Sequence, residues 1–228
     1  MIKYVLLDID DTILDFKKAE AIAVKKTFEL MGIAADDGLI ARYSEINQRQ
    51  WERLERSELT REQVLVERFR ILFDEIGVSA PAEVAQATYE NLLSIGHYFI
   101  DGAEELLNEL YGKYELYIVS NGTAFVQDRR LKSADIVRFF KEIFISERVG
   151  HNKPSKEFFD AALGSIEGFD PECAILLGDS LTSDILGGIN AGIKTCWFNP
   201  KGKAPRPDIV PDYEIKHLSE FPELLKRI

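Results

Sequence analysis

From Asp101 onward, the sequence alternates between short runs with strand character and longer stretches with helical spacing. The runs are Leu116–Val119, Ile143–Ile145, Ala174–Leu177, Thr195–Phe198 and Tyr213–Ile215. Strands and helices that alternate in this way build a parallel sheet with helices on both faces. The apolar run Tyr4–Leu7 has the same character and is expected to join that sheet. We therefore predict an α/β protein with a Rossmann-like, doubly wound parallel sheet.

The segment between the first strand and the rest of the sheet has a helical residue pattern without strands. From about Lys17 to Ser94 it reads as one helix after another, and Thr60 with Gln63 forms a capping box at one helix start. The buried face of that helix is expected at Leu65, Phe69, Leu72 and Ile76. We predict a core domain of residues 1–15 plus 97–228 and an inserted helical-bundle cap domain of residues 16–96, which forms a lid over the site.

Asp8 and Asp10 follow directly after the first strand. Carboxylates at the end of a buried strand are costly unless something compensates their charge, and this end is where open α/β sheets bind ligands. Polar residues also follow two later strands, at 120–122 and 178–184, and Lys153 stands just before a helix. Because parallel strands end at the same edge of a sheet, these groups are expected to converge.

The four carboxylates of this set, Asp8, Asp10, Asp179 and Asp184, would repel each other and need a cation. Oxygen ligands without a Cys or His cluster favour Mg²⁺. Together with Lys153, that ion would neutralise a phosphate dianion, so that one carboxylate attacks phosphorus. A second carboxyl would protonate the leaving oxygen and then activate water.

Other groups near these strand ends suit the phosphoryl oxygens. Ser120 and Asn121 offer a hydroxyl and backbone N–H groups, and Thr12 is a further candidate phosphate neighbour.

Four motifs occur in the order DIDDT, the strand end at Ser120, Lys153 and GDSLTSD, and in this the chain resembles the haloacid dehalogenase-like (HAD) hydrolases with a helical C1 cap. The resemblance implies that Asp8 is the nucleophile that becomes an aspartyl-phosphate. It makes Asp10 the general acid/base, whose backbone carbonyl also binds Mg²⁺.

The same resemblance assigns the remaining motif residues. It makes Asp8 and Asp179 direct Mg²⁺ ligands and places Asp184 beside the metal water shell or Lys153. It implies that Ser120 and Lys153 bind the phosphoryl group.

Within that family, the segments 184–192 and 195–199 are similar to the pyrimidine 5′-nucleotidase branch. This similarity implies a nucleoside monophosphate substrate such as dUMP, UMP or dTMP. Phe16, Asn47 and Trp51 are candidates to contact the pyrimidine ring, with core packing or an exposed helix face as the alternative.

Other functions use the same core. A sugar-phosphate or phosphoglycolate phosphatase and a phosphomutase differ from a nucleotidase mainly in the cap. A haloacid dehalogenase proper needs neither a leaving-group acid nor Mg²⁺, so Asp10, Asp179 and Asp184 argue against it. A non-enzymatic regulator has no physical need for clustered carboxylates.

The composition limits the classes of molecule that the protein is expected to bind. The net charge is −11, which repels a nucleic-acid backbone and leaves a small phosphorylated metabolite as the expected partner. No apolar run has the length of a membrane span, and the two cysteines form no CxxC pair. We expect a cytoplasmic protein without a signal peptide, as a monomer or homodimer.

Overall fold

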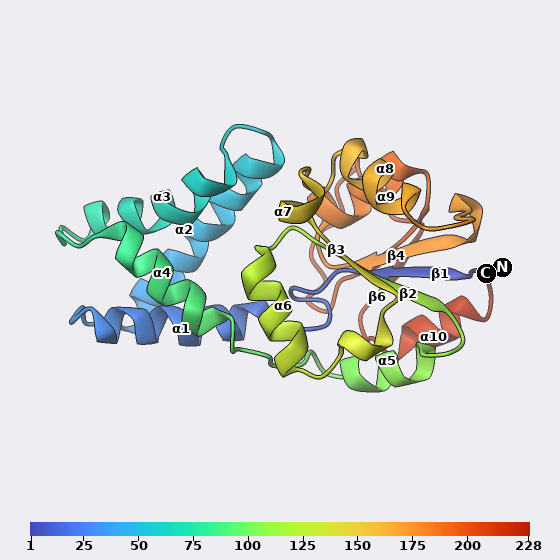
Figure 1. Ribbon diagram of the computed structural model, residues 1–228, viewed down its shortest axis with the longest axis horizontal. Helices are drawn as coiled ribbons and strands as arrows, with labels where there is room; N and C mark the ends of the chain where they lie inside the picture. The colour runs from blue at the N-terminus through green and yellow to red at the C-terminus, as the bar shows by residue number, and fades with distance from the viewer.

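The computed structural model describes all 228 residues and contains one sheet of six parallel strands (Figure 1). The strands are β1 (Tyr4–Leu7), β2 (Glu115–Ser120), β3 (Glu142–Ile145), β4 (Ala174–Gly178), β5 (Lys194–Phe198) and β6 (Tyr213–Ile215), in the order β3-β2-β1-β4-β5-β6. The first strand therefore lies in the middle, between β2 and β4, where the strand order reverses. The predicted fold class is confirmed.

Both faces of the sheet are covered, which explains the unbroken apolar run in β1. Val5 and Leu7 pack in the same cluster as the buried side chains of α5 (Ala103–Leu110) and α10 (Glu220–Leu225). Tyr4 and Leu6 point to the other face, in the cluster that contains α8 (Lys156–Gly164). A strand with helices on both sides has no face left for polar residues.

Several short elements complete the core: α6 (Ala124–Ser133), α7 (Ser146–Val149), α9 (Leu186–Ala191), the 3₁₀ turns Val137–Phe139 and Pro171–Cys173, and the π-helical turn Leu181–Ile185. Helix α6 ends at Ser133, just before Asp135 adopts a positive φ of 56°. The N-cap of α5 is Gly102, with φ 79°. The π turn directly precedes α9.

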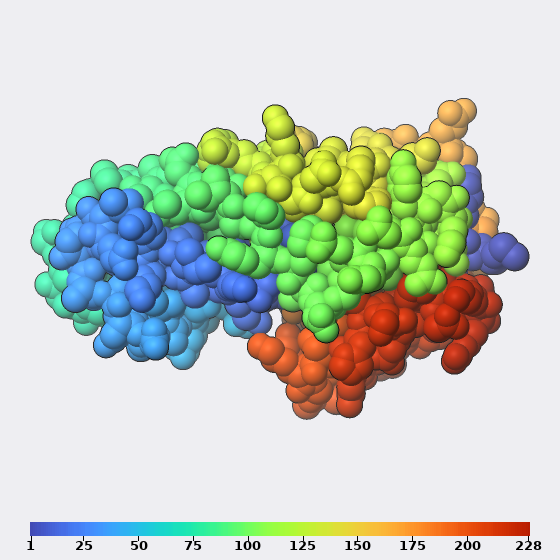
Figure 2. Space-filling view, turned by 90° about the horizontal axis from the view of Figure 1, so that it is seen from below, coloured from blue at the N-terminus to red at the C-terminus, as the bar shows by residue number.

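The inserted segment forms four helices, α1 (Phe16–Leu30), α2 (Asp37–Glu55), α3 (Arg61–Glu75) and α4 (Ala82–Leu93). They enclose a separate hydrophobic cluster in which Phe28, Tyr43, Phe69 and Tyr89 pack edge to face or tilted. Figure 2 shows these helices, blue to teal, as one end of an elongated molecule. In Figure 1 both chain termini lie at the opposite end.

The capping box of Thr60 and Gln63 at the start of α3 is confirmed. The expected buried face of α3 is partly wrong. Phe69 and Leu72 are buried, but Ile76 is exposed and Leu65 lines a cavity. Val64 and Phe73 are the other apolar residues that α3 buries.

The two segments that join the helical bundle to the core are hydrogen-bonded to each other. Asp15 donates its backbone N–H to Tyr98 O at 2.7 Å, and Ile100 donates to Ile13 O at 3.0 Å. Leu14 forms an antiparallel bridge with Phe99 between them. We propose that residues 16–96 are the cap domain and that 1–15 plus 97–228 are the core. No helix combines the length and the apolar character that a membrane span requires.

Candidate active site

Asp8 lies at the carboxyl end of the central strand. Leu7 pairs with Ile118 of β2 and with Leu177 of β4, so the next residue stands where three strands end together. The backbone N–H of Asp8 donates to Leu177 O at 3.0 Å, which extends the strand pairing to this residue. Its side chain is buried. The sheet thus fixes the backbone that carries the predicted nucleophile.

Lys153 is buried beneath the same strand ends, with 1% of its surface exposed. Its Nζ donates to Asp8 Oδ1 at 2.7 Å, to Asp184 Oδ1 at 2.7 Å and to the Val119 carbonyl at 2.8 Å. All three N–H bonds of the ammonium are therefore used. Burial alone would lower the pKa of Lys153, but the carboxylates of Asp184 and Asp8 outweigh it and raise the pKa, so the side chain stays charged.

Asp179 and Asp184 come from the loop after β4. Carboxylate oxygens of Asp8, Asp179 and Asp184 lie within 4.8 Å of one another. Asp184 reaches back under the strand end and accepts a hydrogen bond from Ser180 N at 3.0 Å. Gly178 leaves room for it, because a Cβ at that position would lie 2.3 Å from Asp184 Cγ. The glycine of the GDSLTSD motif is thus required by the side chain six residues later.

The three carboxylates carry more negative charge than Lys153 neutralises. Burial, and then the charge of Asp184, raises the pKa of Asp8 well above its ordinary value. The same two causes raise the pKa of Asp179 to about 6. A group of converging oxygen donors with surplus negative charge is the donor set that Mg²⁺ prefers. The residues therefore fit the predicted ion, with Asp8, Asp179 and Asp184 in reach of it.

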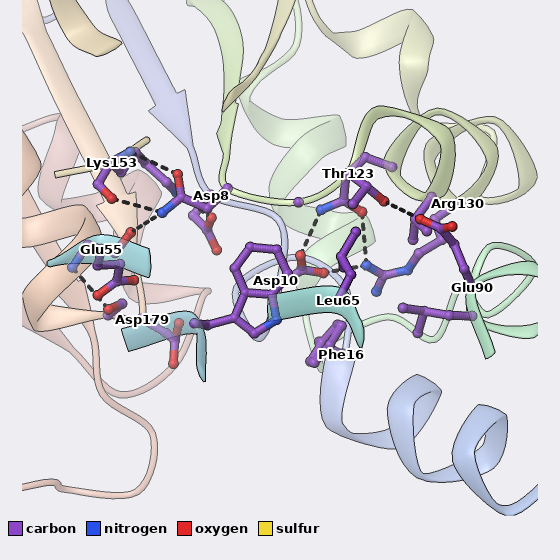
Figure 3. A pocket seen from close by; sticks show the side chains of 18 of the residues that line it. Asp8, Asp10, Phe16, Glu55, Leu65, Glu90, Thr123, Arg130, Lys153 and Asp179 are labelled. Carbon is purple, nitrogen blue, oxygen red and sulfur yellow. Dashed lines mark hydrogen bonds and ion pairs between the residues drawn. The ribbon is translucent and has the colours of Figure 1, made fainter. Parts of the chain in front are cut away.

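Asp10 faces the same cavity, and side chains of α6 hold its carboxylate (Figure 3). Gln127 Nε2 donates to Asp10 Oδ2 at 2.7 Å, and Arg130 Nη1 forms an ion pair with Asp10 Oδ1. Neither α6 residue was predicted as a site residue. No motif marks them, although Gln127 and Arg130 are three residues apart and so share one face of a helix.

The predicted phosphate contacts differ in their access to the cavity. Asn121 and Lys153 line it, whereas Ser120 and Thr12 are buried beside it and do not. Ser120 Oγ accepts hydrogen bonds from Gly122 N at 3.1 Å and Gln127 Nε2 at 2.8 Å, which leaves its own hydroxyl proton free to donate. Thr12 Oγ1 donates to Asp8 Oδ2 at 3.2 Å. We propose that these four residues surround the phosphoryl group.

The cavity, of about 200 Å³, lies between the core and the cap. Of the three cap residues predicted to contact substrate, Phe16 and Trp51 line it. Asn47 does not, and this prediction needs correction. Its side chain is 3% exposed, donates to Glu20 Oε1 at 2.6 Å and accepts from Arg68 Nη1 at 2.7 Å. A polar residue on a cap helix was mistaken for a ligand contact because its buried partners come from two other helices.

Two further cap residues reach the core and were not predicted. Arg61 donates to Gly122 O at 2.8 Å, to Ser146 Oγ at 2.6 Å and to Asn152 Oδ1 at 2.6 Å. Glu55 lines the cavity and accepts from Thr182 Oγ1 at 3.1 Å. Burial raises the pKa of Glu55 to about 7, with the nearby Asp184 charge as a smaller contribution.

The family follows from comparison with known proteins. A model of the haloacid dehalogenase-like hydrolase family matches residues 5–198, which include all the proposed core site residues. The chain belongs to this family. This HAD-like hydrolase is 42% identical to the HAD-hydrolase YfnB of Bacillus subtilis over 96% of its own length and 94% of the relative. A crystal structure of YfnB bound to magnesium superimposes with a TM-score of 0.94, over 98% of each chain.

Two other relatives of the HAD-like hydrolase carry a named activity. The pyrimidine 5′-nucleotidase PynA of Streptococcus pneumoniae is 32% identical over 99% of the chain and 95% of the relative. The pyrimidine 5′-nucleotidase YjjG of Escherichia coli is 29% identical over 97% of each. The family, the magnesium-bound relative and the acidic cluster together confirm the predicted cofactor.

Proposed function

We propose that this HAD-like hydrolase is a phosphomonoesterase that hydrolyses pyrimidine nucleoside 5′-monophosphates through an aspartyl-phosphate. The observation that carries the proposal is the contact of Asp8 with Lys153 inside a group of carboxylates, with Asp10 two residues away at the same cavity. When bound, Mg²⁺ neutralises negative charge of the carboxylates and of the phosphate dianion. Lys153 adds a fixed, buried positive charge to the same place.

In the proposed reaction, Asp8 attacks phosphorus and forms the aspartyl-phosphate while the bond to the ester oxygen breaks. Asp10 donates its proton to that leaving oxygen, which departs as the nucleoside hydroxyl. Asp10 then takes a proton from water, whose oxygen attacks the phosphorus and releases inorganic phosphate and the Asp8 carboxylate. The backbone near Asn121 donates to the phosphoryl oxygens in both steps, and the nearby positive charge of Lys153 stabilises their negative charge.

The pyrimidine nucleotide is supported by the cavity and by the relatives. The ring of Trp51 and the ring of Phe16 line the same cavity as the catalytic carboxylates, so a flat base attached to the phosphate has aromatic surface within reach. PynA and YjjG, which align over nearly the whole chain, are pyrimidine 5′-nucleotidases. A sugar phosphate has no flat aromatic ring to stack on these side chains.

The test is phosphate release from a panel with magnesium present. The panel contains dUMP, UMP and dTMP, purine nucleoside monophosphates, sugar phosphates and phosphoglycolate. We expect pyrimidine nucleotides to give the highest kcat/KM, and Asp8→Asn protein to release none. If sugar phosphates or phosphoglycolate clearly exceed all pyrimidine nucleotides, the nucleotidase proposal fails while the phosphatase proposal stands. Isomerisation of a sugar phosphate without phosphate release would indicate a phosphomutase.

A further inference from the structure

Arg130 on α6 is fully buried and holds two different parts of the molecule. One arm of its guanidinium, Nη1, pairs with Asp10 Oδ1 and also donates to Gln127 Oε1 at 3.1 Å. The other side, Nε, donates to the carbonyl of Gly96 at 2.9 Å. A buried arginine needs such partners, because an unpaired buried charge is strongly destabilising. Here the partners are the proposed general acid and a main-chain carbonyl.

Gly96 belongs to the segment through which the chain returns from the cap to the core. It follows α4 and precedes Tyr98 and Phe99, which bond to the outgoing segment. It also packs directly on the cap helix α1, since a Cβ at Gly96 would lie 3.0 Å from Ala19 Cβ. The position of the Gly96 carbonyl therefore depends on how the cap joins the core.

The guanidinium is a planar, rigid group, so its two sides cannot move independently. If the return segment shifts, Arg130 must shift or lose its bond to Gly96, and Asp10 follows Nη1. Gln127 further restricts the position of the Asp10 carboxylate, because its Nε2 donates to the second oxygen, Oδ2, at 2.7 Å. Both oxygens of the proposed acid are thus held from α6, one of them by a group tied to the cap linker.

We infer that Arg130 is a positioning residue that sets the Asp10 carboxyl for proton transfer according to the position of the cap's return segment. The inference rests on the proposed phosphomonoesterase function and goes beyond it. A general acid must lie within hydrogen-bond reach of the leaving oxygen, and a small misplacement costs a large part of the rate. Through Arg130, the position of the return segment determines whether the Asp10 carboxyl lies where it can protonate the leaving oxygen.

The test compares two esters that differ in their need for the acid. Loss of a nucleoside hydroxyl from UMP requires a proton, whereas p-nitrophenolate is a stable leaving group that departs without one. In Arg130→Lys, one ammonium cannot span the Asp10 and Gly96 sites. We expect kcat/KM for UMP to fall about 100-fold, and for p-nitrophenyl phosphate to fall only about threefold. Arg129→Lys, an exposed neighbour on the same helix, is the control and should change neither.

Several outcomes would overturn the inference. An equal loss for both esters would indicate a merely structural role. A rise in KM for UMP with unchanged kcat would make Arg130 a substrate-binding residue. If wild-type protein hydrolyses another alkyl phosphate but not UMP, the nucleotidase proposal fails, and the same comparison is made with that alkyl ester. If it hydrolyses none, the proposed function itself fails.

The link to the cap is tested from the other end. Gly96→Ala places a methyl group against Ala19 and is expected to displace the return segment, while the side chains of Asp10 and Arg130 are left unaltered. We expect the same selective loss of UMP hydrolysis, by about tenfold or more. The double variant Ala19→Gly with Gly96→Ala restores the space and should restore the rate. Selective loss that the second change does not relieve, or no selective loss in Gly96→Ala, would disprove the coupling.

Discussion

Lys153 Nζ lies 2.7 Å from Asp8 Oδ1, deep under the ends of three parallel strands. The same ammonium is equally close to Asp184, so one cation serves two carboxylates. The proposed nucleophile is thereby oriented before any substrate arrives, but its charge is only partly compensated. Burial, and then this surplus of negative charge, raises the pKa of Asp8, and the surplus accounts for the need of the site for a divalent ion.

Asp8→Asn should abolish turnover while leaving the fold intact. The amide cannot form the aspartyl-phosphate, and it removes a carboxylate that burial and Asp184 disfavour. We therefore expect a metal-free melting temperature no lower than that of the wild type. Activity is measured by phosphate release and the acyl-phosphate by acid-quenched labelling with radioactive substrate. An active Asp8→Asn protein would contradict the mechanism.

Magnesium should stabilise the protein more at pH 7.5 than at pH 5. The folded pKa of Asp179 is about 6 against an ordinary value of 3.8. Between these values the unfolded chain has lost the proton and the folded chain keeps it, so stability falls as pH rises toward 6. Above pH 6 the ionised Asp179 carboxylate destabilises the folded protein by its full amount, until a bound cation compensates its charge. We expect metal-free protein to lose about 1–3 kcal/mol across this window.

The measurement is thermal unfolding with EDTA or with millimolar Mg²⁺ at both pH values. Asp179→Asn should raise the metal-free melting temperature at pH 7.5 and reduce the shift that magnesium produces. An equal magnesium shift at pH 5 and 7.5, or a full shift in Asp179→Asn, would show that this cluster does not hold the ion.

Glu55→Gln should change the pH dependence of KM. Burial holds the pKa of Glu55 at about 7, so the side chain is neutral at pH 6 and charged at pH 8. The charge appears at the cavity that receives a phosphate dianion, and we expect KM to rise roughly fivefold over this range in the wild type. Glu55→Gln should remove the rise, whereas Glu52→Gln on the same helix should not. The prediction fails if both variants follow the wild-type curve.

Arg61→Ala should loosen the cap. It removes three hydrogen bonds from α3 to the core, and the net loss of about 1–2 kcal/mol weakens cap closure roughly tenfold. We expect a larger radius of gyration in solution scattering without substrate and a raised KM. Arg70→Ala, on the same helix, breaks only ion pairs within the cap and should leave both quantities unchanged. Identical scattering of the two variants would argue against this role.

The core of the site was predictable from the sequence because it depends on strand ends. Asp8 and Asp179 directly follow apolar strands, and Lys153 stands just before a helix that follows another strand. Parallel topology brings such positions to one edge of the sheet. The capping box at Thr60 was also predictable, because its two residues are only three positions apart in the sequence. Such features can be predicted from short sequence patterns together with a general rule of sheet topology.

The remaining site residues depend on packing between elements distant in sequence. Arg130 and Arg61 contact partners 120 and 91 residues away, at Asp10 and Asn152, and no local pattern encodes those distances. The prediction for Asn47 was wrong for the same reason, since its hydrogen-bond partners Glu20 and Arg68 lie on other cap helices.

The paired linkers at Leu14 and Phe99 have a consequence for how substrate preference changes in this fold. Entry to and exit from the insertion meet in a short ladder, so an exchange of the bundle at this point would cut no strand of the sheet. We expect a chimera joined at this ladder to keep the carboxylates and the lysine of the recipient and to take the cavity-lining cap residues of the donor.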